Sequence, residues 1–177
     1  MFEKVLVAID GSTFSDAALT AAEGLAAKAG SEVKVVHVHE HDFIPSKAGM
    51  SPDLEAVDEA RAVVDKAVAR LEAHGVNVTG QLVEARTRDV PRVIIEAAEA
   101  TGADLVIVGR RGLSSFTGML VGSVSNKLIH IGKVPIMVAH WDTASVEEAN
   151  PEAARREAQL EDATVSAHAL EQGGLIR

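Results

Sequence analysis

Glycine and hydroxyl residues gather in one stretch of the chain, from 109 to 127, which reads GRRGLSSFTGMLVGSVSNK. It follows the apolar run ADLVIVG, typical of a buried strand, and ends in a segment with helical spacing. Gly109, Gly112 and Gly122 remove side chains where a phosphate chain must approach the backbone, and they permit positive φ values that point successive amides inward. The next helix would begin at Gly122, and its unpaired amides attract anions. The stretch therefore predicts a phosphate-binding loop.

Two serines near the start of that helix, Ser123 and Ser125, could add hydroxyl donors to a phosphate. Neither the Walker P-loop string G-x-x-x-x-G-K-[ST] nor the dinucleotide fingerprint G-x-G-x-x-G occurs in the sequence. A second glycine turn, AIDGST at 8–13, carries Asp10 after the first apolar run. Its carboxylate suits a ribose diol as acceptor or a divalent cation as ligand. The alternative for Asp10 is a plain turn role.

Short apolar runs alternate with alanine-rich segments of helical spacing, which predicts a β-α-β succession. We expect strands at 4–9, 32–38, 77–83, 103–109 and 134–140, and helices at 14–29, about 53–74, about 89–101 and 122–132. Near-continuous apolar strands indicate a parallel sheet covered on both faces. The predicted fold is α/β: an open five-stranded parallel sheet, doubly wound, in the order 3-2-1-4-5. Ligands bind where strand order reverses, so the two glycine motifs would meet between the first and fourth strands.

Residues at the ends of the helical segments support these boundaries. Ser12 or Thr13 can cap the first helix, and Gly30 can close it. Asp89 can cap the third helix, with Pro91 tolerated in its first turn because the donor that proline lacks would be unpaired there. Such caps are common and indicate structure, not function.

The full spacing Gly109-x2-Gly112-x9-Gly122-Ser123 resembles the nucleotide motif G-x2-G-x9-G-[ST] of the universal stress protein family, in its ATP-binding branch. The resemblance covers about 1–141: KVLVAIDGS is similar to the family's opening strand and turn, and GSVSNKLIHIGKVPIMVAH to its last helix and strand. It implies an adenine-nucleotide alpha-hydrolase-like fold that binds ATP with Mg²⁺. It also implies a regulatory stress-response role, as a nucleotide-dependent switch or chaperone-like module with slow or no hydrolysis.

Carried over position by position, the resemblance implies a set of nucleotide contacts. Asp10 would meet the ribose hydroxyls or the metal-bound phosphates, and the backbone at Ala8 and Val38 would flank the adenine. The phosphates would be surrounded by Gly109, Arg110, Gly112, Gly122, Ser123, Val124 and Ser125. No catalytic residue is assigned, because no general base with a supporting partner is apparent near the loop. We therefore expect a weak ATPase at most.

Two other classes of function stay open. An ATP-using enzyme, such as an adenylyl transferase or an ATP pyrophosphatase, would call for H-x-G-H or S-G-G-x-D-S, and neither string is present. A nucleotide-free dimeric interaction protein is the other alternative. Some relatives in the family lack the glycine spacing and bind no ATP, but this sequence has the spacing.

Histidines at 37, 39 and 41 alternate, so on an extended chain they would share a face and could hold a metal. Because the second strand ends there and no cysteine is nearby, we expect them to face solvent instead. The loop at 39–52 is longer than usual for such a connection and is either a lid or a surface excursion.

Composition and charge bear on location and partners. The chain has no cysteine and a formal net charge of -9, which argues against sequence-independent nucleic-acid binding. No signal-type segment opens the chain, and no apolar run reaches the roughly 18 residues of a membrane span, so we expect a cytoplasmic protein.

The end of the chain predicts an assembly and a tail. The apolar run at 134–140 would be an edge strand, and pairing with its counterpart about a two-fold axis would bury it in a homodimer. The segment at 142–177 is acidic, lies outside the resemblance and reads as a marginally helical tail.

Overall fold

The computed structural model describes residues 2–41, 57–110 and 122–140. The strands are β1 (Lys4–Ile9), β2 (Glu32–Glu40), β3 (Val78–Ala85), β4 (Leu105–Gly109) and β5 (Ile136–Ala139). The helices are α1 (Thr13–Ala29), α2 (Val57–Ala73), α3 (Val90–Thr101) and α4 (Ser123–Ile131), with a 3-10 turn, η1 (Thr87–Asp89), before α3. The predicted acidic tail and most of the predicted 39–52 loop lie outside the described residues.

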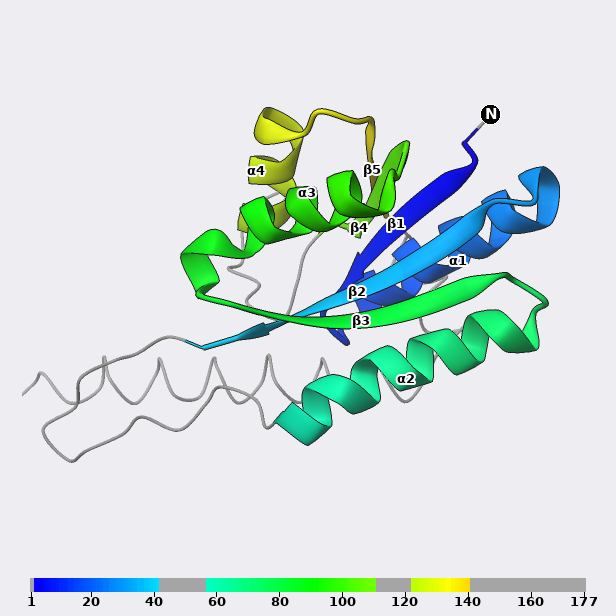
Figure 1. The fold of residues 1–177 in the computed structure, drawn as a ribbon, viewed down its shortest axis with the longest axis horizontal. Helices are drawn as coiled ribbons and strands as arrows, with labels where there is room; N and C mark the ends of the chain where they lie inside the picture. Colours follow the sequence, from blue (N-terminus) through cyan, green and yellow to red (C-terminus); the bar gives the residue numbers. More distant parts are fainter. Residues whose placement is uncertain (1, 42–56, 111–121, 141–177) are drawn as a thin grey trace, which may run out of the picture. The chain divides into compact units, whose positions relative to one another are not determined.

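All strand pairs are parallel, and the order across the sheet is β3-β2-β1-β4-β5 (Figure 1). The predicted topology is therefore confirmed. β1 is the central strand, and its last residues pair with both neighbours: Ile9 with His37 of β2, and Ala8 with Val108 of β4. Because the strands run in one direction, their carboxyl ends meet at one edge of the sheet. The turn after β1, the end of β2 and the end of β4 all lie at this carboxyl edge.

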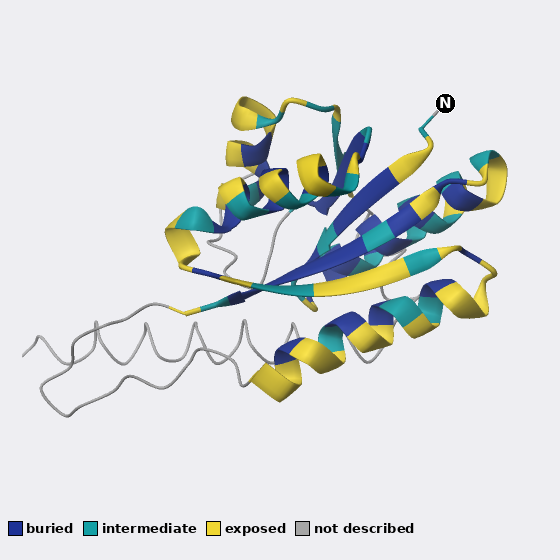
Figure 2. Cartoon of the chain, viewed as in Figure 1, coloured by how far each residue is buried: buried dark blue, intermediate teal, exposed yellow. Residues whose placement is uncertain are grey.

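Helices cover both faces of the sheet (Figure 1). Successive strand residues point to opposite faces, so Val5 and Val7 pack with α1 and α2, whereas Leu6 packs with α3 and α4. The residues of β4 are all buried, while half of those of the edge strand β3 are exposed (Figure 2). The aliphatic core therefore lies around β1, β2 and β4, and it holds the carboxyl edge in place.

The predicted helix ends are partly confirmed. Ser12 caps α1, with its side chain accepting from the backbone N–H of Ser15, and Gly30 closes the helix at a φ of 70°. Pro91 lies in the first turn of α3, as predicted. Asp89 stands before α3 but its side chain forms no capping hydrogen bond, so that cap prediction is wrong. The reason is local: η1 runs directly into α3 and gives Asp89 helical angles (φ -95°, ψ -9°), not the extended ones of a cap.

Across residues 2–41, 57–110 and 122–140, no helix is long and apolar enough to cross a lipid bilayer.

Candidate functional site at the carboxyl edge

The turn after β1 places Asp10 at the carboxyl edge and fixes its carboxylate. Asp10 Oδ1 accepts hydrogen bonds from Ser12 N (3.1 Å), Ser12 Oγ (2.6 Å) and Ser15 Oγ (2.6 Å). Asp10 N in turn donates to Ser15 Oγ (2.9 Å), and both serines are buried. The turn role that the sequence left open is therefore present. A role toward ribose or a metal stays a prediction.

Hydrogen bonds tie the amino end of α4 to the end of β4. Ser125 Oγ is buried and donates to Gly109 O (2.7 Å), Gly122 N donates to Arg110 O (2.7 Å), and Arg110 N donates to Ala139 O of β5 (2.9 Å). The structure thus brings four of the predicted phosphate residues together. In this structure the single hydroxyl hydrogen of Ser125 goes to Gly109, and its predicted donation to a phosphate stays a prediction.

The two described glycines of this motif, Gly109 and Gly122, have ordinary backbone angles, and Gly109 serves close packing. Neither Gly109 nor Gly122 has a positive φ, so that prediction is wrong for both; Gly122 lies at φ -64° and ψ 159°. A Cβ on Gly109 would lie 2.5 Å from the carbonyl oxygen of Phe14 and 2.7 Å from its carbonyl carbon. Close packing of α1 on β4 therefore requires glycine at 109. Gly112 lies outside the described residues.

Three other residues were predicted to contact the nucleotide: Arg110, Ala8 and Val38. Arg110 lies beside α1, and the other two lie on the opposite face of the sheet. The guanidinium carbon of Arg110 lies 5.9 Å from the centre of the Phe14 ring, within cation–π range. Ala8 and Val38 lie on the face covered by α3 and α4, in the same apolar cluster as Val124. The structure thus places the two positions predicted to flank the adenine on the same covered face of the sheet as the helix predicted to hold the phosphates.

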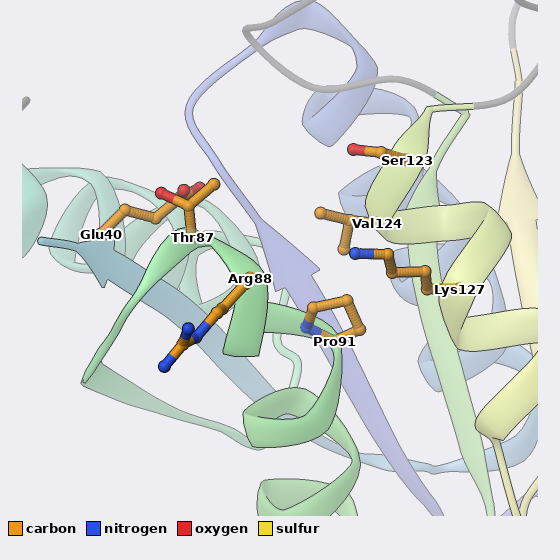
Figure 3. Close-up of a pocket in the computed structure, with 7 residues that line it drawn as sticks. All are labelled: Glu40, Thr87, Arg88, Pro91, Ser123, Val124 and Lys127. Carbon is orange, nitrogen blue, oxygen red and sulfur yellow. The ribbon is translucent and has the colours of Figure 1, made fainter. Parts of the chain in front are cut away.

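A cavity of about 290 Å³ opens at the carboxyl edge on this face (Figure 3). This volume lies near the lower end of the range for small-molecule sites. The cavity is lined by the end of β2, by η1, by the start of α3 and by α4: Glu40, Thr87, Arg88, Pro91, Ser123, Val124 and Lys127. Two of the predicted site residues, Ser123 and Val124, are among them. Asp10, Gly109 and Arg110 are not among its lining residues.

Sequence reasoning missed five lining residues: Glu40, Thr87, Arg88, Pro91 and Lys127. It considered the loops after the first and fourth strands, whereas one wall of the cavity is built by the end of β2 and by the segment after β3. A signal existed for Lys127, since it lies four residues after Ser123 and therefore on the same side of α4. Glu40 gave a weaker signal as the polar residue that ends a buried strand.

The three histidines are not a solvent-facing group. His37 and His39 are only 4% and 2% exposed, and only His41 is exposed. His37 Nδ1 lies 2.9 Å from Ile9 O, so this nitrogen donates, because a carbonyl only accepts. The prediction of solvent-facing histidines is wrong for His37 and His39 and confirmed for His41. β2 lies between two strands, and its burial continues as far as His39. No group of three or more His, Cys, Asp or Glu among the described side chains is placed to hold a metal.

The fold and the site define the chain as a doubly wound α/β protein with a cavity beside a helix start at the carboxyl edge of its sheet. The model of the universal stress protein family matches residues 1–140. The chain therefore belongs to the universal stress protein family. It is 32% identical to the universal stress protein YxiE of Bacillus subtilis over 147 residues, which cover 78% of this chain and 99% of that protein.

The chain spans about half the length of other curated relatives that it matches. It covers 50% of a universal stress protein of Mycolicibacterium smegmatis and 44% of Rv2005c of Mycobacterium tuberculosis.

Two solved structures support the fold. A universal stress protein family member from Burkholderia pseudomallei is 31% identical with a TM-score of 0.60, covering 77% of this chain and 94% of that chain. A universal stress protein solved in complex with cAMP is 25% identical with a TM-score of 0.60, covering 80% of this chain and 99% of that chain.

Proposed function

We propose that this chain is a regulatory protein that binds an adenine nucleotide, ATP with Mg²⁺, at the carboxyl edge of its sheet. The bound nucleotide would bias conformation or partner choice, as a switch or a chaperone-like module, with slow or no hydrolysis. The observation that carries the proposal is that the first turn of α4 lines a cavity there. The similar protein solved with cAMP supports adenine as the base.

The start of α4 is the proposed phosphate site. Gly122 precedes the helix without a side-chain cap, and Ser123 and Val124 follow in its first turn. Unpaired amides at this end would donate to phosphate oxygens, and the helix dipole favours their negative charge. On this proposal Ser123 adds a hydroxyl donor from the wall of the cavity. Ser125 also holds the helix against β4 through its bond to Gly109, and a hydroxyl contact to phosphate is proposed for it too.

The remaining proposed contacts concern the base, the ribose and the metal. Ala8 and Val38 would flank the adenine with their backbone, and Asp10 would meet the ribose. Mg²⁺ would arrive with the nucleotide and take most of its ligands from phosphate oxygens and water, as this ion usually does. Asp10 is its proposed protein ligand, since a carboxylate supplies the hard oxygen that the ion prefers.

The proposal is tested by extracting any co-purifying nucleotide and then titrating ATP into the stripped protein by calorimetry. Gly122→Val should abolish measurable ATP binding, because the valine side chain would crowd the phosphate. The backbone angles of Gly122 are ones that valine also adopts, so we expect the variant to fold. Gly24→Val is the matched control, because it is exposed on α1 with nothing within 4 Å of a Cβ. No bound adenine nucleotide and no ATP affinity below about 1 mM, a binding free energy of about -4 kcal/mol, would refute the proposal. Unchanged affinity in Gly122→Val would place the phosphates elsewhere.

We further propose a homodimer through β5, which forms one edge of the sheet. Met137 is only half-buried there, and on α4 Ile129 and Ile131 are 51% and 47% exposed. Pairing of two copies about a two-fold axis would cover an edge strand and apolar side chains together. Light scattering that finds a monomer at micromolar concentration would contradict it.

Three further expectations rest on the sequence. We propose that 1–141 forms the nucleotide-binding domain and that 142–177 is an acidic appendage to it. A cytoplasmic location and the lack of nucleic-acid partners stay predictions.

Release of phosphate, pyrophosphate or AMP at a substantial rate in the presence of ATP would favour the enzyme alternative.

A further inference from the structure

The cavity at the carboxyl edge has opposite charges on its two walls (Figure 3). Glu40, the last residue of β2, and Thr87 of η1 stand on one wall. Ser123 and Lys127 of α4 stand on the other. Throughout the described part of the chain, neither Glu40 nor Lys127 forms an ion pair. The two charges are therefore available to groups of a ligand.

Lys127 is the cation directed into the cavity. Figure 3 shows its side chain extending toward the centre, whereas the side chain of Arg88 points away. Arg88 is 72% exposed, and its Nε lies 3.7 Å from a carboxylate oxygen of Asp89. Lys127 also lies one turn beyond Ser123 on the same side of α4. Its ammonium and the start of the helix therefore favour an anion at the same end of the cavity.

The opposite end accepts hydrogen bonds. Glu40 lies two residues beyond Val38 on β2, so both side chains point to the same face of the sheet. Val38 is the position proposed to flank the base, which places the Glu40 carboxylate beside it. The buried Pro91 and the half-buried Val124, which lie near Lys127 in Figure 3, add apolar surface to the cavity that suits a flat ring.

We propose that this polarity selects a nucleotide that carries an exocyclic amine. Glu40 accepts a hydrogen bond from the amine of the base, and Lys127 contacts the phosphate next to the ribose. Adenine presents such an amine, whereas a base with a carbonyl at that position sets an acceptor against the carboxylate. The inference rests on the proposed function and adds the residues that determine specificity at the same site.

The test compares three ligands by calorimetry on the whole chain: AMP, IMP and adenosine. IMP has a carbonyl in place of the amine, and adenosine lacks the phosphate. We expect AMP to bind at least tenfold more tightly than either, since a hydrogen bond to a charged group is worth about 10-fold to 100-fold in affinity.

Two substitutions test which end of the cavity binds the base and which binds the phosphate. Glu40→Gln should remove most of the preference for AMP over IMP, because an amide can both accept and donate. Lys127→Met keeps the length of the side chain and should lower AMP affinity toward that of adenosine, with adenosine binding unchanged. Glu72→Gln and Lys66→Met make the same charge changes at exposed positions of α2 and should leave all three affinities unchanged.

The outcomes separate the inference from the proposed function. If the wild-type chain binds none of the three ligands, the proposed function fails and the inference with it. If it binds AMP and IMP equally, or if Glu40→Gln keeps the full preference for AMP, the role of Glu40 is overturned. If Lys127→Met weakens AMP and adenosine equally, Lys127 does not contact the phosphate.

Discussion

Gly109→Ala should destabilise the fold even when no nucleotide is present. Gly109 is the buried last residue of β4, and a Cβ there would lie 2.5 Å from the carbonyl oxygen of Phe14. Ordinary van der Waals contact begins at 3.4 Å, so α1 and β4 must separate by most of an ångström. The atom in the way belongs to the backbone of a helix and cannot turn aside. A role in phosphate binding alone would instead affect affinity and leave stability unchanged.

The size of the effect follows from overpacking. Forcing an extra carbon into a well-packed interior costs about 1–3 kcal/mol. With a urea m-value of about 2 kcal/mol per molar, the unfolding midpoint should fall by about 0.5–1.5 M. Urea titration of the nucleotide-free protein, followed by far-ultraviolet circular dichroism, measures this shift.

Gly24→Ala is the matched control, because the same substitution should have the opposite effect there. Gly24 lies inside α1, is exposed, and has nothing within 4 Å of a Cβ. Alanine is favoured over glycine in a helix interior by about 0.5–1 kcal/mol, so the midpoint should rise. If Gly109→Ala unfolds at the wild-type midpoint while Gly24→Ala is stabilised, the packing explanation of Gly109 is refuted.

Two other predictions concern single contacts. Ser125→Ala leaves the carbonyl of Gly109 without its buried hydrogen-bond donor. The free energy of unfolding, measured by urea titration, should therefore fall by about 1–3 kcal/mol. An unchanged unfolding midpoint would show that this bond does not hold α4 against β4. The pKa of Lys133 is raised above 10.5, because a Glu99 carboxylate oxygen 2.7 Å away accepts its hydrogen bond and carries negative charge. NMR titration should therefore find a lower Lys133 pKa in Glu99→Gln than in the wild-type chain. This pair should stabilise the folded chain at neutral pH, and that stabilisation should be lost as the pH rises through the raised pKa of Lys133. The same Lys133 pKa in both proteins would contradict the assignment.

Much of the fold was predictable because its signals are local. The run KVLVAI at 4–9 is continuous and apolar and ends at an Asp-Gly turn, and β1 has the predicted bounds. Alternation of strands and helices restricts the connections to right-handed crossovers, and the observed order is one of the few common doubly wound orders compatible with them. Asp89 shows the limit of such signals, since a capping residue type does not cap when the turn before it is already helical.

The site was less predictable, because contacts distant in sequence determine it. The burial of His37 and His39 depends on the neighbouring strands and on the helices that cover their face of the sheet, none of which their own spacing reveals. The sequence also did not reveal that the Ser125 hydroxyl donates to a carbonyl 16 residues earlier, that of Gly109.

The sequence by itself determined the succession of elements and the family motif, because both follow from patterns within short segments. The strand order was predictable only by adding the general rules for doubly wound sheets to that succession. Only the tertiary structure decided which residues form the walls of the cavity and why Gly109 must be glycine. Glu40 and Lys127 are 87 residues apart, and Phe14 and Gly109 are 95 apart. The members of each pair come to the same region only when parallel strands align their carboxyl ends and helices pack across them, and no local pattern records the distance between them.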